Sequence, residues 1–164
     1  MSEFIEWTDN LVLGLPEIDD QHLGMTTVLN QLAEAVQLKI GGEYNMGSPP
    51  LAVRTPMGEV DREQESAIGT THYIHQLLDE LVRHTCEHFK YEEELMEKLQ
   101  YSGLSGHKRE HTMLVAELAS YVKDITRGAE PLEKKTLCAL KEWLIVHILE
   151  SDKAFANHAH KSGG

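Results

Sequence analysis

Residues 84–96 read HTCEHFKYEEELM, and this stretch decides how the rest of the chain is interpreted. His88 and Glu92 are four positions apart, so on a helix both project from one face. The largely apolar stripe on that face has helical spacing and contains Ile74, Leu77, Leu78, Leu81, Thr85, Leu95 and Leu99. We therefore predict a helix over residues 70–100 whose inward face is interrupted by an imidazole and a carboxylate.

Three further helices are predicted from the same periodicity. The first covers residues 19–40, with Asp19 or Asp20 as its cap and Gly41-Gly42 as its end. Another covers residues 105–127, and the last begins near Pro131, a residue favoured in a first helical turn. No segment alternates polar and apolar residues as a strand would. The sequence thus predicts an all-α, antiparallel up-down-up-down four-helix bundle.

Two segments fall outside these helices. Residues 1–18 are expected to form an N-terminal arm, and residues 41–69 a long loop. The loop is predicted because it opens with the glycine- and proline-rich GGEYNMGSPPLAVRTPMG and continues with the charged EVDREQES. At 164 residues, the chain is expected to be one domain over residues 1–164.

Seven polar side chains lie on the inward stripes of the four helices. Burying such groups is costly unless they are paired or coordinated, so we expect them to be metal ligands. Seven ligands are too many for one ion and suit two ions that share bridges. Imidazoles with carboxylates favour iron, zinc or manganese. The predicted ligands are His22, His88, Glu92, His107, His111, His147 and Asp152.

One spacing does not fit an ideal helix. His147 and Asp152 are five positions apart, which is about 140° of rotation, so an α-helix does not place both on one face. Either Asp152 reaches around near the end of the helix, or a π-bulge lies between the two residues. Both alternatives remain open at this stage.

Other metal motifs are less well supported. Residues 107–111, HKREH, match the H-x-x-E-H pattern of inverted zinc proteases, but the further ligand expected far downstream has little chain left to supply it. Ferritin-like di-iron bundles need paired E-x-x-H motifs, and no histidine here follows a glutamate by three positions. A metal-free helical bundle is the simplest alternative.

Composition excludes several classes of function. The net charge of -12 disfavours nucleic acid and anionic lipid as partners. No apolar run is long enough to span a membrane, and the N-terminus does not read as a signal peptide, so we expect a cytoplasmic protein. Cys86 and Cys138 are expected to be free, buried thiols.

Four segments together resemble the hemerythrin family, specifically its single-domain bacterial members, the bacteriohemerythrins. They are Trp7 with LGLPEIDDQH (13–22), HTCEHFKYEEELM (84–96), YSGLSGHKREH (101–111) and LKEWLIVHILESDK (140–153). The ligand order H…HxxxE…HxxxH…HxxxxD, including the awkward last spacing, is specific to that family. The resemblance covers nearly the whole chain except the 41–69 segment.

The resemblance implies a cofactor of two non-haem iron ions with an oxo or hydroxo bridge. His107, His111 and His147 would bind one iron. His22 and His88 would bind the other, which keeps an open position for dioxygen. The two carboxylates, Glu92 and Asp152, would bridge both irons.

The same resemblance implies reversible oxygen binding for storage, delivery or scavenging, rather than an enzyme. Two alternatives are an oxygen or redox sensor acting through a protein partner, and a di-iron peroxidase or nitric oxide-handling enzyme. The sensor could use the 41–69 segment, which is longer than the family usually has and is either a tolerated insertion or a docking segment. The enzyme would need a proton donor, and His84 is the candidate.

Residues within a turn of the ligands are expected either to keep the site dry or simply to fill the core. Trp143 is a candidate for contact with a ligand or for packing alone. His84 stands where the family commonly has tyrosine, and we expect it to lie beside the site or partly exposed rather than to be an eighth ligand. The candidate lining consists of Met25, Phe89, Leu114, Leu144 and Ile148.

Overall fold

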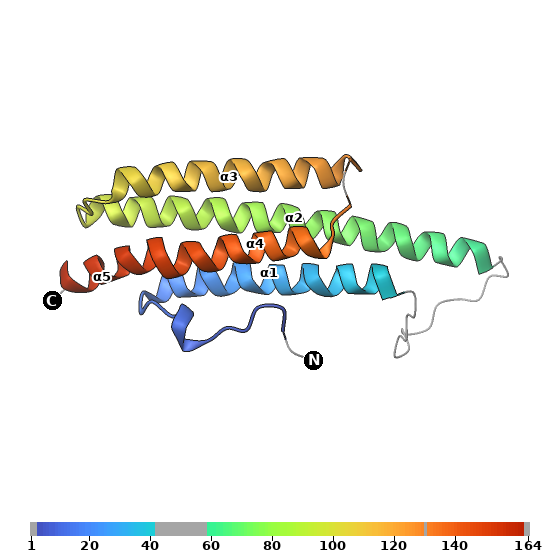
Figure 1. Cartoon of the computed structure of the whole chain (residues 1–164), viewed down its shortest axis with the longest axis horizontal. Coiled ribbons are helices and arrows are strands. Elements are labelled where there is room, and N and C mark those ends of the chain that lie inside the picture. The colour runs from blue at the N-terminus through green and yellow to red at the C-terminus, as the bar shows by residue number, and fades with distance from the viewer. Residues whose placement is uncertain (1–2, 42–58, 130, 163–164) are drawn as a thin grey trace.

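The computed structural model describes residues 3–41, 59–129 and 131–162 (Figure 1). The elements in chain order are a short 3-10 helix η1 (Asp9–Leu11), α1 (Pro16–Gly41), α2 (Glu59–Lys98), α3 (Leu104–Thr126), α4 (Lys134–His147), a π-helical turn η2 (Ile148–Asp152) and α5 (Lys153–Ser162). The described residues contain no strand. None of their helices is long and apolar enough to cross a membrane.

The helices α1, α2, α3 and α4 pack as an antiparallel bundle in which each runs opposite to its predecessor (Figure 1). The predicted up-down-up-down bundle is therefore confirmed. Helix α4, the turn η2 and α5 follow one another without a break and together form the fourth rod. Fully buried side chains between the rods include Leu29, Leu32, Leu78, Leu81, Leu118, Leu144 and Phe155.

Element boundaries differ from the sequence prediction in three places. Helix α2 begins at Glu59, so the predicted loop was wrong for residues 59–69, while residues 42–58 lie outside the described part. EVDREQES is charged but lacks proline and glycine, and its Glu, Arg and Gln residues are good helix formers. Helix α1 begins at Pro16 rather than after residue 18, and α4 at Lys134 rather than near Pro131.

The N-terminal arm lies along the bundle and is attached through its backbone. The side chain of Asn30 accepts from the Ile5 N–H at 2.7 Å and donates to the Ile5 carbonyl at 3.0 Å. Asp19 accepts from the backbone N–H groups of Leu13 and Gly14, at 2.7 and 3.0 Å. Gly14 has φ +75°, a conformation that favours glycine. The contacts of Asp19 attach the arm to the first turn of α1, less than two turns before His22.

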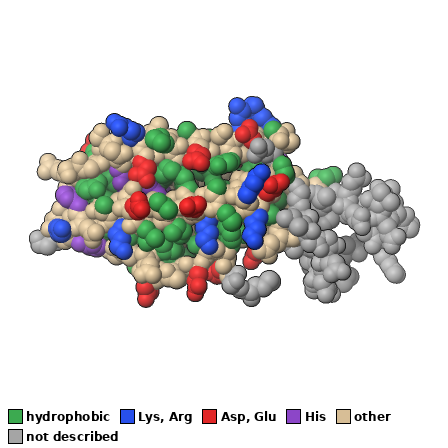
Figure 2. All heavy atoms as spheres, viewed as in Figure 1, with side chains coloured by type: hydrophobic (Ala, Val, Ile, Leu, Met, Phe, Trp, Pro, Cys, Tyr) green, Lys and Arg blue, Asp and Glu red, His purple; other side chains and the backbone are tan. Residues whose placement is uncertain are grey.

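Two histidines of α5, to which the sequence assigned no role, attach the C-terminal helix. His158 Nε2 donates to the Leu99 carbonyl at 3.0 Å, just after the end of α2. His160 Nε2 donates to the Leu13 carbonyl at 2.8 Å, in the arm. The arm, the end of α2 and α5 therefore meet at one end of the bundle. Figure 2 shows histidine side chains gathered at that end.

The two cysteines are free, as expected, but they are exposed rather than buried. Cys86 is two positions before His88, which places it about 200° around the helix from that inward side chain. Cys138 directly follows the buried Leu137 and lies outside the inward face of α4. The prediction of buried thiols was wrong, because the position of a residue around its helix determines whether its side chain faces the core.

Candidate metal centre

The four rods bring the seven predicted ligands together in the interior. Helix α1 contributes one residue, α2 and α3 two each, α4 one at its last position, and η2 one. Every one of them is at most 5% exposed. Their donor atoms form two groups, each with its atoms within 4.8 Å of one another. The five-residue group is Glu92, His107, His111, His147 and Asp152, and the three-residue group is His22, His88 and Asp152.

The turn η2 explains how His147 and Asp152 share one face. Residues Ile148–Asp152 are π-helical, and a π-turn takes up one residue more than an α-turn. The five-residue spacing therefore closes roughly one turn, and His147 Nε2 lies 3.0 Å from Asp152 Oδ1. Of the two alternatives left open by the sequence, the structure has the π-bulge.

The two carboxylates lie between the groups. Asp152 Oδ1 faces His107 and His147, at 3.2 and 3.0 Å from their Nε2 atoms, and Oδ2 faces His22 and His88, at 3.0 and 3.9 Å. Each oxygen of Asp152 thus faces a different group. The second carboxylate, Glu92, places Oε2 3.2 Å from His107 Nε2 and 3.7 Å from His88 Nε2.

Three further residues, here called the outer partners, contact the ligands from outside. Gln21 Oε1 lies 3.0 Å from His88 Nδ1, Glu93 Oε1 2.9 Å from His111 Nδ1, and Glu110 Oε1 2.9 Å from His147 Nδ1. These oxygens can only accept, so each Nδ1 carries the proton and donates it. Each Nε2 then keeps its lone pair and directs it inward.

Sequence reasoning missed the outer partners as a group, although each of them is adjacent in the chain to a ligand. Gln21 precedes His22, Glu93 follows Glu92, and Glu110 precedes His111. Each contacts a ligand on the next rod rather than its own neighbour: α1 to α2, α2 to α3, and α3 to α4. Their adjacency to predicted ligands in the chain was the available signal. Which histidine each of them contacts depends on how the helices pack.

The residues fit a metal centre, because without a cation their arrangement is unfavourable. His111 Nε2 and His147 Nε2 are 3.2 Å apart, so two lone pairs face each other when both rings are neutral and carry their proton on Nδ1. Within the described residues, Glu92 Oε1 and both oxygens of Asp152 are buried without a partner in hydrogen-bond geometry. Converging lone pairs and buried anionic oxygens are what a cation requires.

The shifted pKa values in the cluster also indicate that its carboxylates need a compensating positive charge. Burial by itself would lower the pKa of His107, but contacts with Asp152 and Glu92 outweigh it and raise that pKa to about 9. Burial would raise the pKa of Asp152, yet its contacts with His107, His147 and His22 hold it well below its usual value. In the metal-free chain, a proton on imidazole compensates the carboxylates.

An apolar layer surrounds the ligands. Met25, Phe89, Leu144 and Ile148 are buried, and only Leu114 of the predicted lining is half-buried. The ring of Phe89 stacks on His111, with centroids 3.6 Å apart and planes 6° apart. Trp143 is 6.2 Å from Phe89 between ring centroids.

His84 is not part of either ligand group. Its side chain is 27% exposed and its Nε2 lies 3.5 Å from Glu80 Oε1 and 3.3 Å from the Arg83 guanidinium. His84 is partly exposed, as expected. His84 also packs beside Gly24 of α1, where an added Cβ would lie 3.4 Å from its ring.

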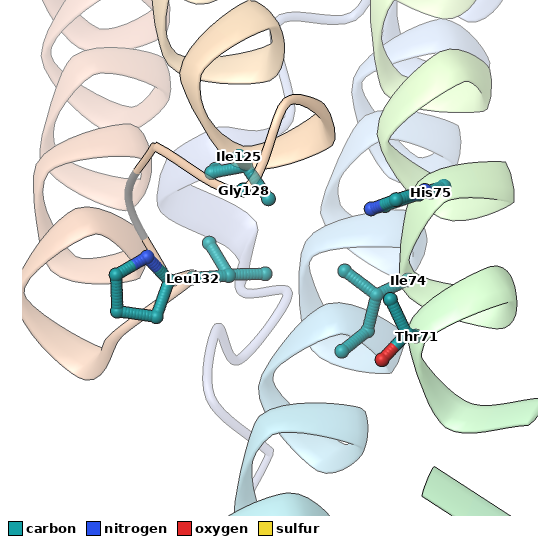
Figure 3. Close-up of a pocket in the computed structure, with 7 residues that line it drawn as sticks. Thr71, Ile74, His75, Ile125, Gly128 and Leu132 are labelled. Atoms are coloured by element: carbon teal, nitrogen blue, oxygen red, sulfur yellow. The ribbon is translucent and has the colours of Figure 1, made fainter. Parts of the chain in front are cut away.

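A cavity of about 270 Å³ lies toward the end of the bundle opposite to the one where the arm and α5 meet (Figure 3). Its lining comes from α2, from the end of α3 and from the segment that joins α3 to α4. Figure 3 shows Ile74 and Leu132 on opposite sides of it, with His75 on α2. None of the seven ligands lines this cavity.

Comparison with known proteins identifies the family. The model of the hemerythrin HHE cation binding domain matches residues 13–159. A bacteriohemerythrin of Stenotrophomonas maltophilia is 30% identical over 96% of this chain and 90% of its own length. One of Methylococcus capsulatus is 33% identical over 55% of this chain and 69% of its own.

Solved structures agree in fold. A wild-type hemerythrin crystal structure has a TM-score of 0.70 and 24% identity, and the match covers 94% of this chain and 96% of that one. The helical topology, the matched family model and the bacterial relatives lead to one conclusion: this chain belongs to the hemerythrin family.

Proposed function

We propose that this chain binds dioxygen reversibly at a non-haem di-iron centre. The observation that carries the proposal is the position of Asp152, whose two oxygens face different groups of histidines. A carboxylate so placed is suited to bridging two ions, each held by its own imidazoles. The bacteriohemerythrins that resemble this chain, and a partial match to a myohemerythrin of Riftia pachyptila, support the same function.

Each residue has an assigned role in this proposal. His107, His111 and His147 hold one iron, and His22 and His88 hold the second. Glu92 and Asp152 would bind both irons, whose remaining bridge would be an oxo or hydroxo group. Because His22 and His88 would supply the second iron with fewer nitrogen ligands, that iron would keep a position open, as a ligand-binding metal requires.

When bound, the iron pair supplies the vacant coordination position and the electrons that reversible oxygen binding uses. The chain's own contribution is to orient the ligands and to exclude water. Outer partners hold three imidazoles with Nε2 inward. Buried Met25, Phe89, Leu144 and Ile148 keep stray protons and water from the site, which favours release of oxygen rather than irreversible oxidation of the iron.

The geometry favours storage, delivery or scavenging of oxygen over catalysis. The enzyme alternative needed His84 as a proton donor beside the open position. His84 instead is partly exposed, contacts Glu80 and Arg83, and packs beside Gly24 of α1. The sensor alternative needed a partner at residues 41–69, of which residues 42–58 lie outside the described part.

An oxygen-binding cycle tests the proposal. The apoprotein is loaded anaerobically with two equivalents of ferrous iron, exposed to air and then returned to anoxia, while its absorption spectrum is recorded. We expect a charge-transfer band in air that disappears when oxygen is removed and returns over several cycles. A single irreversible change, or turnover with added peroxide, would exclude reversible binding as the function.

Two histidines on α2, one turn apart, provide a matched pair of variants. His88→Ala removes an inward ligand, and we expect the reversible band to be lost. His84→Ala removes a partly exposed histidine of the same helix, and we expect the band to persist. Equal loss in both variants would show that the band depends on the stability of α2 rather than on the site.

A further inference from the structure

The outer partners of the two ligand groups differ in charge. His111 and His147, both in the five-residue group, donate Nδ1–H to the carboxylates of Glu93 and Glu110. His88, in the three-residue group, donates to the neutral amide of Gln21. The remaining histidine of that group, His22, has a buried Nδ1 without a partner among the described residues.

The inner ligands of the two groups also differ in charge, and this difference has the same direction as that of the outer partners. The five-residue group contains Glu92, whose Oε2 lies 3.2 and 3.4 Å from the Nε2 atoms of His107 and His111 but 3.7 Å from that of His88. An imidazole that donates to a carboxylate is a more basic ligand than one that donates to an amide. The histidines of the five-residue group thus have four carboxylates within reach, Glu92, Glu93, Glu110 and Asp152, whereas those of the three-residue group have the shared Asp152 and, at the longer distance of 3.7 Å, Glu92.

We propose that Glu93 and Glu110 make the five-residue group the tighter of two unequal cation sites, so that metal ions load in a set order. The first divalent cation binds at Glu92, His107, His111, His147 and Asp152. The second binds at His22 and His88 and is the first to leave. This inference rests on the proposed two-metal centre and assigns Glu93, Glu110 and Gln21 as positioning residues that determine the affinity of each site.

The two outer carboxylates do not contribute equally. Lys108 Nζ lies 3.7 Å from Glu93 Oε2 and offsets part of its charge. Glu110 accepts from Ser151 Oγ at 2.7 Å with its second oxygen, which orients it toward His147 without neutralising it. Ser151 lies in η2, next to Asp152, so Glu110 also attaches the π-turn to α3. Removing the charge of Glu110 is therefore expected to have the larger effect.

The experiment is a titration of the apoprotein with Zn²⁺ alone, which is free of redox chemistry, against a competing chelator. Calorimetry and metal analysis of the desalted protein measure both equivalents. For the unmodified chain we expect two steps of unequal affinity. Glu110→Gln should weaken the first step about 10- to 100-fold, as loss of an outer contact to a metal-bound histidine does, and leave the second step in place. Gln21→Glu should strengthen the second step and bring the two affinities together.

Glu94→Gln is the matched control. It makes the same change of charge one position after Glu93, on an exposed side chain, and should leave both steps unchanged. Far-ultraviolet circular dichroism of each apoprotein establishes that the variant is folded.

The outcomes separate the two proposals. If the unmodified chain binds no Zn²⁺, or one equivalent only, the two-metal centre itself is wrong. If it binds two equivalents of equal affinity, or if Glu110→Gln weakens the second step instead of the first, the centre stands and the order of loading is overturned. An equal effect of Glu94→Gln would show that general surface charge, rather than contact with His147, sets the affinity.

Discussion

At the scale of single residues, Asp152 has the most contacts with the other ligands. It is fully buried, and four imidazoles approach its two oxygens. A buried carboxylate in such surroundings is stable only when positive charge compensates it. In the folded chain that charge comes either from a cation or from protons held on the histidines.

We predict that Asp152→Asn reduces metal content from two equivalents to one or fewer. The amide keeps the volume and the position but loses the charge and one of the two anionic oxygens that face the groups. Atomic absorption of protein loaded with iron and then desalted measures the result. Glu150→Gln, an exposed change of charge in the same turn, is the control. Retention of two equivalents by Asp152→Asn would contradict its assignment as a bridge.

The raised pKa of His107 predicts how stability depends on pH in the absence of metal. Its pKa is 6.5 in the unfolded chain and about 9 in the folded one, so the folded state binds the proton more tightly. This stabilisation is fully present below pH 6.5 and is lost as the pH rises toward 9. The melting temperature of chelator-treated protein should fall over that range.

With metal bound, the melting temperature should instead rise with pH. Metal ligation requires neutral imidazoles, so binding releases protons and becomes stronger at higher pH. Melting curves at a series of pH values, with metal and with chelator, test both directions. The same falling trend in the two series would show that protons, rather than cations, compensate Glu92 and Asp152 under both conditions.

At the scale of elements, the ends of the rods were harder to predict than their faces. Helical periodicity placed six of the predicted ligands on the inward faces of α1 to α4, because it depends on local geometry alone, whereas Asp152 lies in η2. The predicted start of α2 was wrong because the charged segment EVDREQES consists largely of residue types that favour a helix. The role of α5 depends on contacts far away in the chain, at Leu13 and Leu99.

We predict that His160→Ala loosens the attachment of α5 to the arm. The variant loses one hydrogen bond to the Leu13 carbonyl, worth about 0.5–1.5 kcal/mol, which lowers the melting temperature by roughly 1–6 °C in a chain of this length. Differential scanning calorimetry measures the change. His72→Ala, at an exposed position of α2, should leave the melting temperature unaltered. An equal decrease of the melting temperature in His72→Ala would mean that the effect of His160→Ala is not due to its hydrogen bond with Leu13.

At the scale of the whole molecule, the proposed centre involves the entire bundle. All four rods supply predicted ligands, so a pair of ions bound as proposed would link every rod to its neighbours near one end of the bundle. At the other end, the cavity between α2 and the α3–α4 segment is lined without any of these ligands. Stability is therefore expected to respond strongly to metal.

We predict that chelation of the metal lowers the melting temperature by roughly 8–16 °C. A ligand present at a thousand times its dissociation constant stabilises the folded state by about 4 kcal/mol, and each kcal/mol corresponds to about 2–4 °C in a domain of this size. Melting curves before and after treatment with a strong chelator, with re-addition of iron as the control, measure the shift. Identical curves would be incompatible with a buried metal centre.

The amino-acid sequence by itself determined the helical faces and six of the seven inward polar residues, because a periodicity of 3.6 residues is a property of the local chain. Only the tertiary structure decided that the spacing from His147 to Asp152 closes through a π-turn. It also decided that Gln21, Glu93 and Glu110 each contact a histidine on the following rod. The physical reason is that those contacts depend on the axial offset between packed helices, which no single segment encodes.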